Sequence, residues 1–464
     1  DLPVSPALDA FLRQGWIVAE RADVDAHDLA ARCAPRRHRL SRSLPGERLV
    51  VPSGQPRLRG NSQEYRFRPS SDYVYLTGDQ SPGGVLVLEP DAGEHHATLF
   101  VRPPSDPGTI DFFRDDRHGE LWVGPRPSLA EVEAAAGIPC RPLGELTASL
   151  DPSVATRVRR GIDAEVDALV AAADPYPDAE LRALLSELRL VKDDWEVEQI
   201  QQAVDATIRG FEDVVRALPA AIAEGGERRV EGVFVQRARI DGNDAAFNPI
   251  AASGAHATTL HWTRNDGLLQ PEELLLLDAG VETRTLYAAD LTRTLPLGGT
   301  FTPDQRRMLE LVNAAHEAAL GAVRPGAPFR EFRRAASTVL AEGLADWGLL
   351  PVRAAESLVD DSGLHRRYTV CAPGHMLGLD VHDCADARSD RYLDGALERG
   401  NVLTVEPGVY LQSHDLTVPE RLRGVGVRIE DDVLVTESGC RVLSERLPRR
   451  PDEVESWMTG LRSE

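Results

Sequence analysis

The first part of the chain alternates short apolar runs with a helical pattern. Residues 48–52 (RLVVP) and 84–88 (GVLVL) are predicted to be buried strands because they are apolar and bounded by Pro or Gly, and residues 97–101 (ATLFV) form a third. Ser128 followed by Glu131 is the capping-box pattern of a short helix that ends near Gly137. This alternation predicts an α/β domain, and no catalytic cluster stands out in it.

A strongly amphipathic stretch begins at Asp194 and runs to Leu218. Its apolar residues recur at spacings of three and four, which predicts a helix with one buried face: Val197, Ile200, Val204, Ile208, Phe211 and Val215. We place a domain boundary just before it. The predicted domains are residues 1–188 and residues 189–464.

The second domain combines helices that have clear start signals with strands. Thr302, Pro303 and Gln305 are typical of a helix start, with an N-cap, a proline at the first position and a capping-box Gln, and residues 328–350 predict another helix. Residues 273–278 and 287–297 predict a hairpin, and residues 401–411 and 424–436 predict further strands. This is an α+β layout.

Composition and charge narrow the function classes. The chain has 464 residues and a formal net charge of −22, which disfavours partners that need Lys and Arg neutralisation, namely nucleic acids and anionic membranes. The five cysteines are scattered with no CxxC pair, so neither a disulfide framework nor a thiolate zinc site is indicated. With no signal-like start and no apolar run of about 20 residues, a cytoplasmic protein is expected.

Four carboxylates and one histidine lie in strand-like or Gly-flanked apolar contexts: Asp278, Asp290, His375, Glu406 and Glu430. Taken alone, Asp278 would be interpreted as the cap of a turn, each Glu as an edge residue and His375 as an ordinary core or surface residue. As a set, they form an oxygen-rich group suited to two divalent ions. If the two strands carrying Asp278 and Asp290 pair, those carboxylates can lie side by side, which requires a proton or a cation between them.

Several motifs together resemble aminopeptidase P, the proline-specific branch of the pita-bread metallopeptidases. They are SGAHATTLHWTRND around His261, DAG and YAADLTRTLP, GHMLGLDVHD, TVEPGVY, and PERLRGVGVRIEDD. RFRPSSDYVYLTG at residues 66–78 resembles the family's amino domain, so the resemblance covers nearly the whole chain. It implies an α/β N-terminal domain followed by an α+β pita-bread catalytic domain.

The resemblance also implies a metal site and a reaction. Asp278 would hold one ion, His375 and Glu406 the other, and Asp290 and Glu430 would bridge both. The expected ions are Mn²⁺, with Co²⁺ and Zn²⁺ as alternatives. Water activated by the ions would hydrolyse the first peptide bond of substrates with proline at the second position.

Four further residues receive roles from the same resemblance. His382 would contact the substrate and the developing oxyanion, and His261 would line the pocket near the proline. Arg428 would orient the metal ligands together with Tyr410. Packing or surface roles are the alternatives for His261, His382 and Arg428. The family's peptide substrates and its common dimers or tetramers are expected as partners.

Two departures from the family pattern bear on activity. Eleven residues separate Asp278 from Asp290, where the family usually has ten, and a longer turn absorbs one residue. Cys371 stands where the family typically has a further His, four residues before His375. The alternatives are therefore a prolidase-like Xaa-Pro dipeptidase or a relative with altered substrate or reduced activity. A non-catalytic peptide-binding relative and a metal-free hydrolase both conflict with the complete ligand set.

Overall fold

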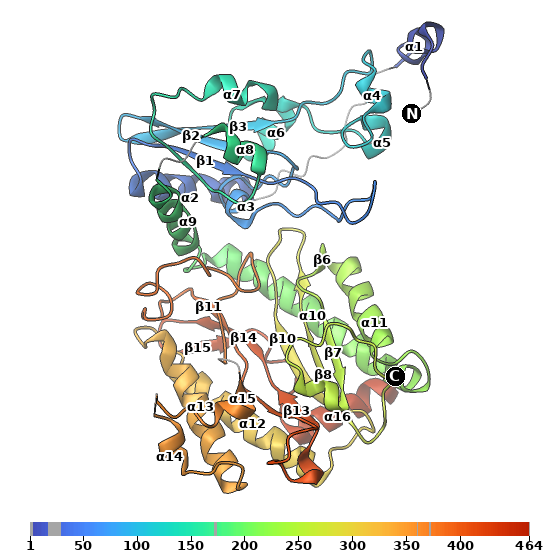
Figure 1. The fold of residues 1–464 in the computed structure, drawn as a ribbon, viewed down its shortest axis with the longest axis vertical. Helices are drawn as coiled ribbons and strands as arrows, with labels where there is room; N and C mark the ends of the chain where they lie inside the picture. Colours follow the sequence, from blue (N-terminus) through green and yellow to red (C-terminus); the bar gives the residue numbers. More distant parts are fainter. Residues whose placement is uncertain (1–2, 17–28, 171–173, 360, 371–372, 464) are drawn as a thin grey trace. The chain divides into compact units, whose positions relative to one another are not determined.

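The computed structural model describes residues 3–16, 29–170, 174–359, 361–370 and 373–463. The chain divides into two compact units, Asp1–Leu188 and Arg189–Glu464 (Figure 1). Within the described residues, no helix has both the length and the apolar character needed to cross a membrane.

The N-terminal unit is built on a five-stranded sheet in the order β4-β3-β2-β1-β5. The strands are β1 (Arg48–Pro52), β2 (Val85–Asp91), β3 (Glu94–Val101), β4 (Cys140–Pro142) and β5 (Thr156–Val158). β1 pairs antiparallel with β2 and parallel with β5, and β3 pairs parallel with β4. The three predicted strands are confirmed, with β2 and β3 each extended into the turn that joins them. Apolar side chains of this sheet, including Val50, Val87 and Phe100, form the unit's core.

Short helices accompany this sheet: α1 (Pro6–Leu12), α2 (Leu29–Ser43), α3 (Ser71–Thr77), α4 (Asp111–Arg114), α5 (Glu120–Val123), α6 (Leu129–Ala136), η1 (Leu143–Glu145), α7 (Leu146–Ser149), α8 (Ala164–Leu169) and α9 (Tyr176–Leu188). The predicted capping box at the start of α6 is present: the Ser128 side chain accepts from the Glu131 amide, and the Glu131 carboxylate accepts from the Ser128 amide. Gly137 ends α6 in the left-handed conformation that glycine adopts readily. The α/β prediction is confirmed for this unit.

The helices of the C-terminal unit pack as two pairs. α10 (Asp194–Ala223) packs on α11 (Gly226–Asp241), and α12 (Pro303–Ala322) packs on α13 (Phe329–Asp346). Figure 1 shows the strands of this unit between the two pairs. Capping boxes begin α10 at Asp193 and α12 at Thr302, the second as predicted. The remaining helices are η2 (Gly254–Thr258), α14 (Ala354–Ser357), α15 (Arg366–Thr369), η3 (Glu420–Leu422) and α16 (Pro451–Ser463).

The strands of this unit form small antiparallel sheets. One sheet has the order β10-β8-β7 and another β11-β14-β15, while β12 pairs with β13 and β6 with β9. Their bounds are β6 (Asp244–Ala245), β7 (Ile250–Ser253), β8 (Leu274–Ala279), β9 (Val281–Glu282), β10 (Leu291–Pro296), β11 (Val402–Val405), β12 (Gly408–Leu411), β13 (Val425–Arg428), β14 (Asp431–Val435) and β15 (Cys440–Val442). β8 and β10 pair antiparallel as the predicted hairpin requires, with Asp278 opposite Thr292.

The two long strands predicted near the C-terminus are each broken in the middle. Residues 401–411 form β11 and β12 with Glu406 at the break, and residues 424–436 form β13 and β14 with Glu430 at the break. β11 pairs with β14 while β12 pairs with β13, so both runs change partner sheet at the same level. The expectation that both Glu residues lie inside continuous strands was therefore wrong. They lie where the ladder hydrogen bonds are interrupted.

We expect Leu276→Ala to destabilise the C-terminal unit strongly. Leu276 is 1% exposed in the central strand β8 and packs in a cluster with Ile250 and Tyr410. Removing a buried Leu side chain costs about 2–5 kcal/mol because contacts are lost and a cavity remains. Leu268→Ala, at a side chain that is 75% exposed, is the matched control and should shift the denaturant midpoint little. Equal midpoints for the two variants would contradict this assignment of the core.

Candidate metal centre

Five predicted residues reach one region of the C-terminal unit from five separate segments. Asp278 lies on β8, Asp290 directly precedes β10, and Glu406 and Glu430 lie at the two strand breaks. His375 lies in the loop that precedes β11 and is tied to that strand, because the Thr404 hydroxyl accepts from the His375 amide at 3.1 Å. Asp290, Glu406 and Glu430 lie where strands begin or break and are therefore outside the regular ladders, whereas Asp278 lies within the β8 ladder opposite Thr292.

The ligating atoms of Asp290, His375 and Glu430 all lie within 4.8 Å of one another. The Nε2 atom of His375 is 3.5 Å from Asp290 Oδ2 and 3.5 Å from Glu406 Oε1. Its other ring nitrogen, Nδ1, is 3.1 Å from the Met376 carbonyl oxygen, which leaves Nε2 directed at the carboxylates. This is the arrangement in which a histidine presents one nitrogen to a metal and secures the other on the protein.

Three carboxylates of this cluster and its histidine have shifted pKa values. Burial, together with the negative charges of Asp278 and Glu406, raises the pKa of Asp290 to about 7, despite the opposing effect of His375. Burial also raises the pKa of Glu406, and burial with the neighbouring carboxylates raises that of Glu430 well above its usual value. Burial lowers the pKa of His375, but the hydrogen bond to Asp290 and the charge of Glu406 outweigh it, so the pKa rises to about 9. A cation between these groups would replace the protons that they otherwise retain.

Asp278 is held from one side by Arg428. The Arg428 guanidinium donates through Nη2 to Asp278 Oδ2, through Nη1 to the Tyr410 hydroxyl at 2.9 Å and through Nε to the Thr292 hydroxyl at 3.1 Å. Burial lowers the pKa of Arg428, yet Tyr410 and the surrounding carboxylates raise it well above its usual value. The second oxygen of Asp278, Oδ1, is buried with no hydrogen-bond partner among the described residues. An orphaned carboxylate oxygen beside three converging ligands fits a divalent metal ion.

Two residues that the sequence did not single out support the ligands. The Thr292 hydroxyl donates to Glu430 Oε2 at 2.7 Å, and the Glu430 amide donates to the Thr292 carbonyl at 3.0 Å. Asp432 is fully buried, and its Oδ2 accepts from the Asp290 amide at 3.1 Å. The signal that could have identified Asp432 is a pair of acidic residues directly after Glu430 in an apolar strand.

His382 belongs to the same loop as His375. The two rings meet edge to face with centroids 4.2 Å apart. Partial burial and the charges of His375 and His261 lower the pKa of His382, which favours its neutral form. His261 and His382 are both solvent-exposed at the rim of the ligand cluster, whereas Arg428 and Tyr410 are buried.

A buried ion cluster follows His382 directly. Asp383 is 1% exposed and pairs with Arg189 Nε at 3.0 Å and Lys192 Nζ at 3.1 Å. Its amide donates to the Met376 carbonyl at 2.9 Å, which closes the loop that carries both histidines. Burial alone would raise the pKa of Asp383, but the two cations lower it, so the loop is anchored by a charged carboxylate. Sequence reasoning missed this cluster because its members are about 190 residues apart. Cys371, the departure from the family pattern, lies outside the described residues.

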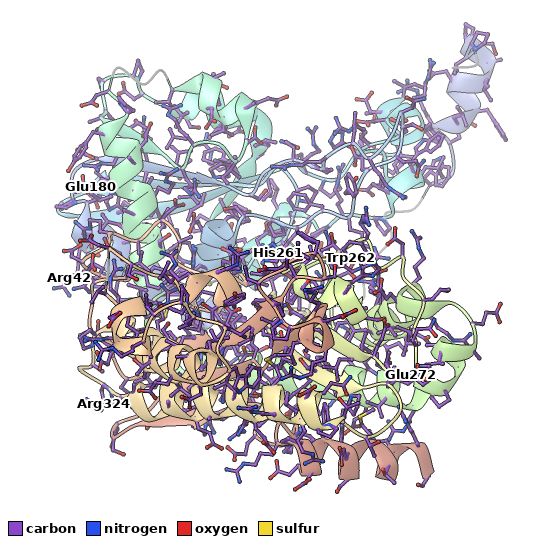
Figure 2. All side chains as sticks on the ribbon, turned by 60° about the horizontal axis from the view of Figure 1, so that its bottom comes forward. Arg42, Glu180, His261, Trp262, Glu272 and Arg324 are labelled. Carbon is purple, nitrogen blue, oxygen red and sulfur yellow. The ribbon has the colours of Figure 1, made fainter. Side chains whose placement is uncertain are left out.

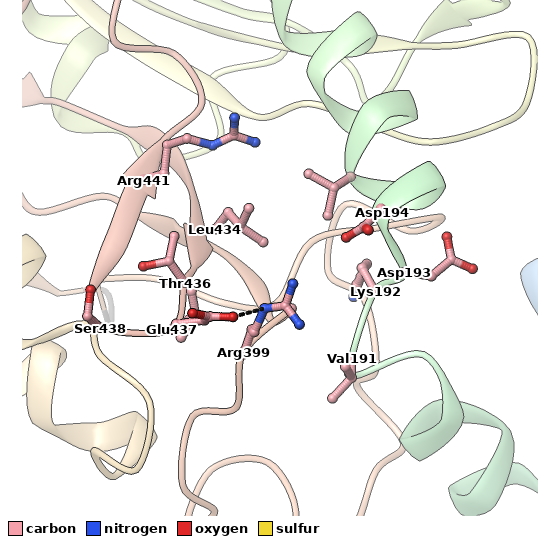
Figure 3. A pocket seen from close by; sticks show the side chains of 13 residues that line it. Val191, Lys192, Asp193, Asp194, Arg399, Leu434, Thr436, Glu437, Ser438 and Arg441 are labelled. Atoms are coloured by element: carbon pink, nitrogen blue, oxygen red, sulfur yellow. Dashed lines mark ion pairs between the residues drawn. The ribbon is translucent and has the colours of Figure 1, made fainter.

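A groove of about 750 Å³ opens elsewhere on the same unit (Figure 3). It lies between the start of α10 and the end of β14, and two of the residues that line it, Arg399 and Glu437, pair at 3.9 Å. Lys192 contributes to its wall. Among the described residues that line it, none is a predicted site residue, so the groove is separate from the ligand cluster.

Comparisons with known proteins agree with this geometry. The profile described as metallopeptidase family M24 matches residues 198–437, and the profile of the aminopeptidase P N-terminal domain matches residues 33–159. Xaa-Pro aminopeptidase 1 of Streptomyces coelicolor is 52% identical over 461 residues, which cover 99% of this chain and 93% of that protein.

Solved structures give the same result. Aminopeptidase P from E. coli with the inhibitor Pro-Leu is similar at a TM-score of 0.82 and 28% identity, and the match covers 94% of this chain and 99% of that one. The Zn-substituted E. coli aminopeptidase P in complex with product matches with the same values. The pita-bread fold predicted for the C-terminal unit is confirmed by these neighbours. A family of metallopeptidases implies divalent metal ions, and the carboxylate cluster supplies fitting ligands. The chain belongs to metallopeptidase family M24.

Proposed function

We propose that this protein is an Xaa-Pro aminopeptidase, which hydrolyses the first peptide bond of peptides with proline at the second position. The observation that carries the proposal is the cluster of Asp290, His375 and Glu430 with Glu406 beside His375, in a chain 52% identical to Xaa-Pro aminopeptidase 1. Asp278 adds an oxygen, Oδ1, that has no hydrogen-bond partner among the described residues. The prolidase-like alternative is not favoured, because the similar full-length relatives carry the aminopeptidase name.

The ligand roles follow the resemblance and the contacts together. Asp278 would hold one ion and His375 with Glu406 the other, while Asp290 and Glu430 would bridge them. A bound pair of divalent ions supplies a water of lowered pKa as nucleophile and a Lewis acid for the scissile carbonyl. The chain's part is to orient the predicted ligands, which the bonds from Arg428 to Asp278, from Thr292 to Glu430 and from His375 to the Met376 carbonyl support.

The remaining predicted residues act on the substrate side. His382 stands against the His375 ring with a lowered pKa, so a neutral imidazole there can donate one hydrogen bond to the developing oxyanion. His261 is exposed on a neighbouring loop and would contact the substrate near its proline. Arg428 and Tyr410 are buried behind Asp278, so their role is to hold that ligand in place.

A peptide bond to proline lacks the amide hydrogen that extended-chain binding uses, and proline restricts the residue before it. A peptidase for such bonds must therefore rely on other contacts. One such contact would be between the free amino group of the substrate and the acidic metal centre. This contact would explain why only one residue is released from the N-terminus.

The metal, the compartment and the assembly belong to the same proposal. Mn²⁺ suits the four carboxylates and one imidazole, with Co²⁺ and Zn²⁺ as alternatives. A cytoplasmic location is supported by the free thiols of Cys33, Cys140, Cys384 and Cys440. A homo-oligomer is supported by the consecutive exposed side chains of Leu121, Trp122 and Val123, which are 56%, 61% and 51% exposed.

The reaction is tested with a pair of tripeptides, Xaa-Pro-Yaa and Xaa-Ala-Yaa. Metal-stripped enzyme should release nothing, and added Mn²⁺ should restore release of the first residue from the proline peptide only. The measurement is chromatography of the products with and without metal. The dipeptide Xaa-Pro is assayed in parallel, and cleavage of this dipeptide but of neither tripeptide would point to a dipeptidase. Release without metal would refute the metallopeptidase mechanism.

Asp290→Asn is expected to remove bound metal and to lower turnover by ~100-fold or more, because changes to outer partners of metal ligands already cost about 10–100-fold. The control is Asp205→Asn, whose carboxylate pairs with Arg446 at 2.7 Å on the surface of α10. Metal content by mass spectrometry and initial rates are measured on both variants. If Asp290→Asn binds two ions and turns over like the wild type, the bridging role is wrong.

A further inference from the structure

The loop that carries His261 is tied down at both of its ends. We name residues 254–266, between Ser253 at the end of β7 and Gly267, the rim loop. It begins with η2 and contains His261 and Trp262 side by side (Figure 2). Loops of this length are ordinarily among the more mobile parts of a protein. The rim loop is instead held by several hydrogen bonds.

A single buried carboxylate gathers the rim loop. Glu227, in the first turn of α11, is fully buried. Its Oε1 accepts from the Ser253 amide at 2.8 Å and from His256 Nδ1 at 2.8 Å. Its Oε2 accepts from the Gly267 amide at 2.7 Å and from the Trp262 indole N–H at 2.9 Å. The carboxylate therefore binds the residue on each side of the loop and two side chains within it.

The backbones of α11 and the end of the loop touch closely enough to require glycine. The Glu227 amide donates to the Gly267 carbonyl at 2.9 Å. A Cβ on Gly226 would lie 2.1 Å from that carbonyl oxygen, and Gly226 has a φ of +58°. A Cβ on Gly267 would lie 2.7 Å from His256 Nδ1 and 2.8 Å from Glu227. Gly226 excludes a larger residue because of its backbone contact and its positive φ, while a larger residue at Gly267 would displace the side chains of His256 and Glu227.

Further bonds leave His261 as the exposed part of a fixed loop. Asn265 is fully buried and bonds the neighbouring strand β7 through the Ala251 amide at 2.9 Å and the preceding Pro249 carbonyl at 2.9 Å. Gln412, directly after β12, donates to the Thr258 carbonyl at 2.6 Å. His261 lies between these anchors and faces solvent.

Trp262 connects the rim loop to the metal side of the unit. Its ring stacks on His256 with centroids 3.8 Å apart, and the Arg264 guanidinium lies 4.2 Å from its centroid on the same loop. It also packs against the apolar cluster that contains Tyr410, the residue bonded to Arg428. The rotamer of Trp262 is thus fixed by Glu227, and the backbone of His261 is fixed with it.

From these contacts we infer that Glu227 is a positioning residue for substrate recognition, which acts through His261. The inference rests on the proposed function, because it assigns Glu227 to the positioning of His261, which is proposed to contact the substrate near its proline. Because the rim loop is already ordered before binding, it loses little conformational entropy when the substrate binds. A displacement of about 1 Å at such a contact can cost 10²-fold in rate.

A carboxylate is required because four donors converge on it. Two carboxylate oxygens offer about four acceptor positions, whereas the Gln side chain offers one oxygen and an NH₂ group that is itself a donor. Glu227→Gln keeps the size of the side chain and turns two of the four bonds into contacts between donors. The substitution therefore loosens the rim loop without opening a cavity.

The test is a double-mutant cycle with His261→Ala on an Xaa-Pro-Yaa tripeptide. We expect Glu227→Gln to lower kcat/KM by ~10–100-fold in the wild-type background, with bound metal unchanged. In the His261→Ala background, it should lower kcat/KM by no more than about twofold, because the group it positions is gone. Losses that multiply in the double variant would overturn the inference.

Glu196→Gln is the matched control. Glu196 is also a buried carboxylate, 2% exposed, and it accepts from the Tyr287 hydroxyl at 2.9 Å, outside the rim loop. Whatever loss it causes should multiply with that of His261→Ala. If Glu196→Gln shows the same non-additivity as Glu227→Gln, the coupling is general to the fold and the inference fails.

Hydrogen–deuterium exchange separates this inference from the proposed function. Amides of residues 254–266 should exchange faster in Glu227→Gln than in the wild type, whether or not the enzyme cleaves the tripeptide. Unchanged exchange would overturn the positioning role, while a wild type without peptidase activity would refute only the proposed function. If Glu227→Gln does not fold, Trp262→Phe removes one bond to the same carboxylate, keeps an aromatic ring and takes its place in both measurements.

Discussion

The C-terminal unit is organised around buried negative charge that its own cations, Arg428 and His375, neutralise only in part. Asp278, Asp290, Glu406 and Glu430 converge with His375 and Arg428, and the pKa of Asp290 rises to about 7 while that of Glu430 rises well above its ordinary value. Carboxylates at such distances stay ionised only if a cation lies among them. Metal binding and the stability of this unit are therefore linked, because ions that bind the folded state favour it.

The way the strands end makes that convergence feasible. A carboxylate inside a regular ladder would point to one face of its sheet and meet only its cross-strand neighbours. Glu406 and Glu430 instead lie at the level where β11–β14 pairing changes to β12–β13 pairing. Asp290 precedes β10, where its amide is taken by Asp432 rather than by a strand. The interruptions in the sheets thus supply three of the predicted ligands, Asp290, Glu406 and Glu430, whereas Asp278 lies within the regular ladder of β8.

Much of the fold could be predicted from the sequence because the signals for its elements are local. The three strands of the N-terminal unit and the capping boxes at Ser128 and Thr302 depend on residues within one turn or one strand. The break at Glu406 had a local signal that the strand prediction overlooked, because Pro407 and Gly408 follow it directly and a Pro-Gly pair is typical of a turn. The break at Glu430 had no such signal, since neither Pro nor Gly lies between Val427 and Val435. The five predicted ligands were identified as a set through their motifs, and the structure brings them into one region of the unit, while their metal-binding role stays a prediction. The supports of the histidine loops were not found. Asp383 with Arg189 and Lys192 anchors the loop of His375, and Glu227 anchors the rim loop of His261, and both join residues distant in the sequence.

Those supports share one physical design, in which a buried carboxylate organises a loop that carries an exposed histidine. Asp383 closes the loop of His375 and His382 with two cations, and Glu227 closes the loop of His261 with four N–H donors. A carboxylate buried without such partners would be costly, so each loop geometry is stabilised by the need to keep its carboxylate satisfied. The two arrangements differ in what they tolerate. Ion pairs act over some distance, whereas four converging N–H groups require each donor in its place, which makes the rim loop the more sharply defined of the two.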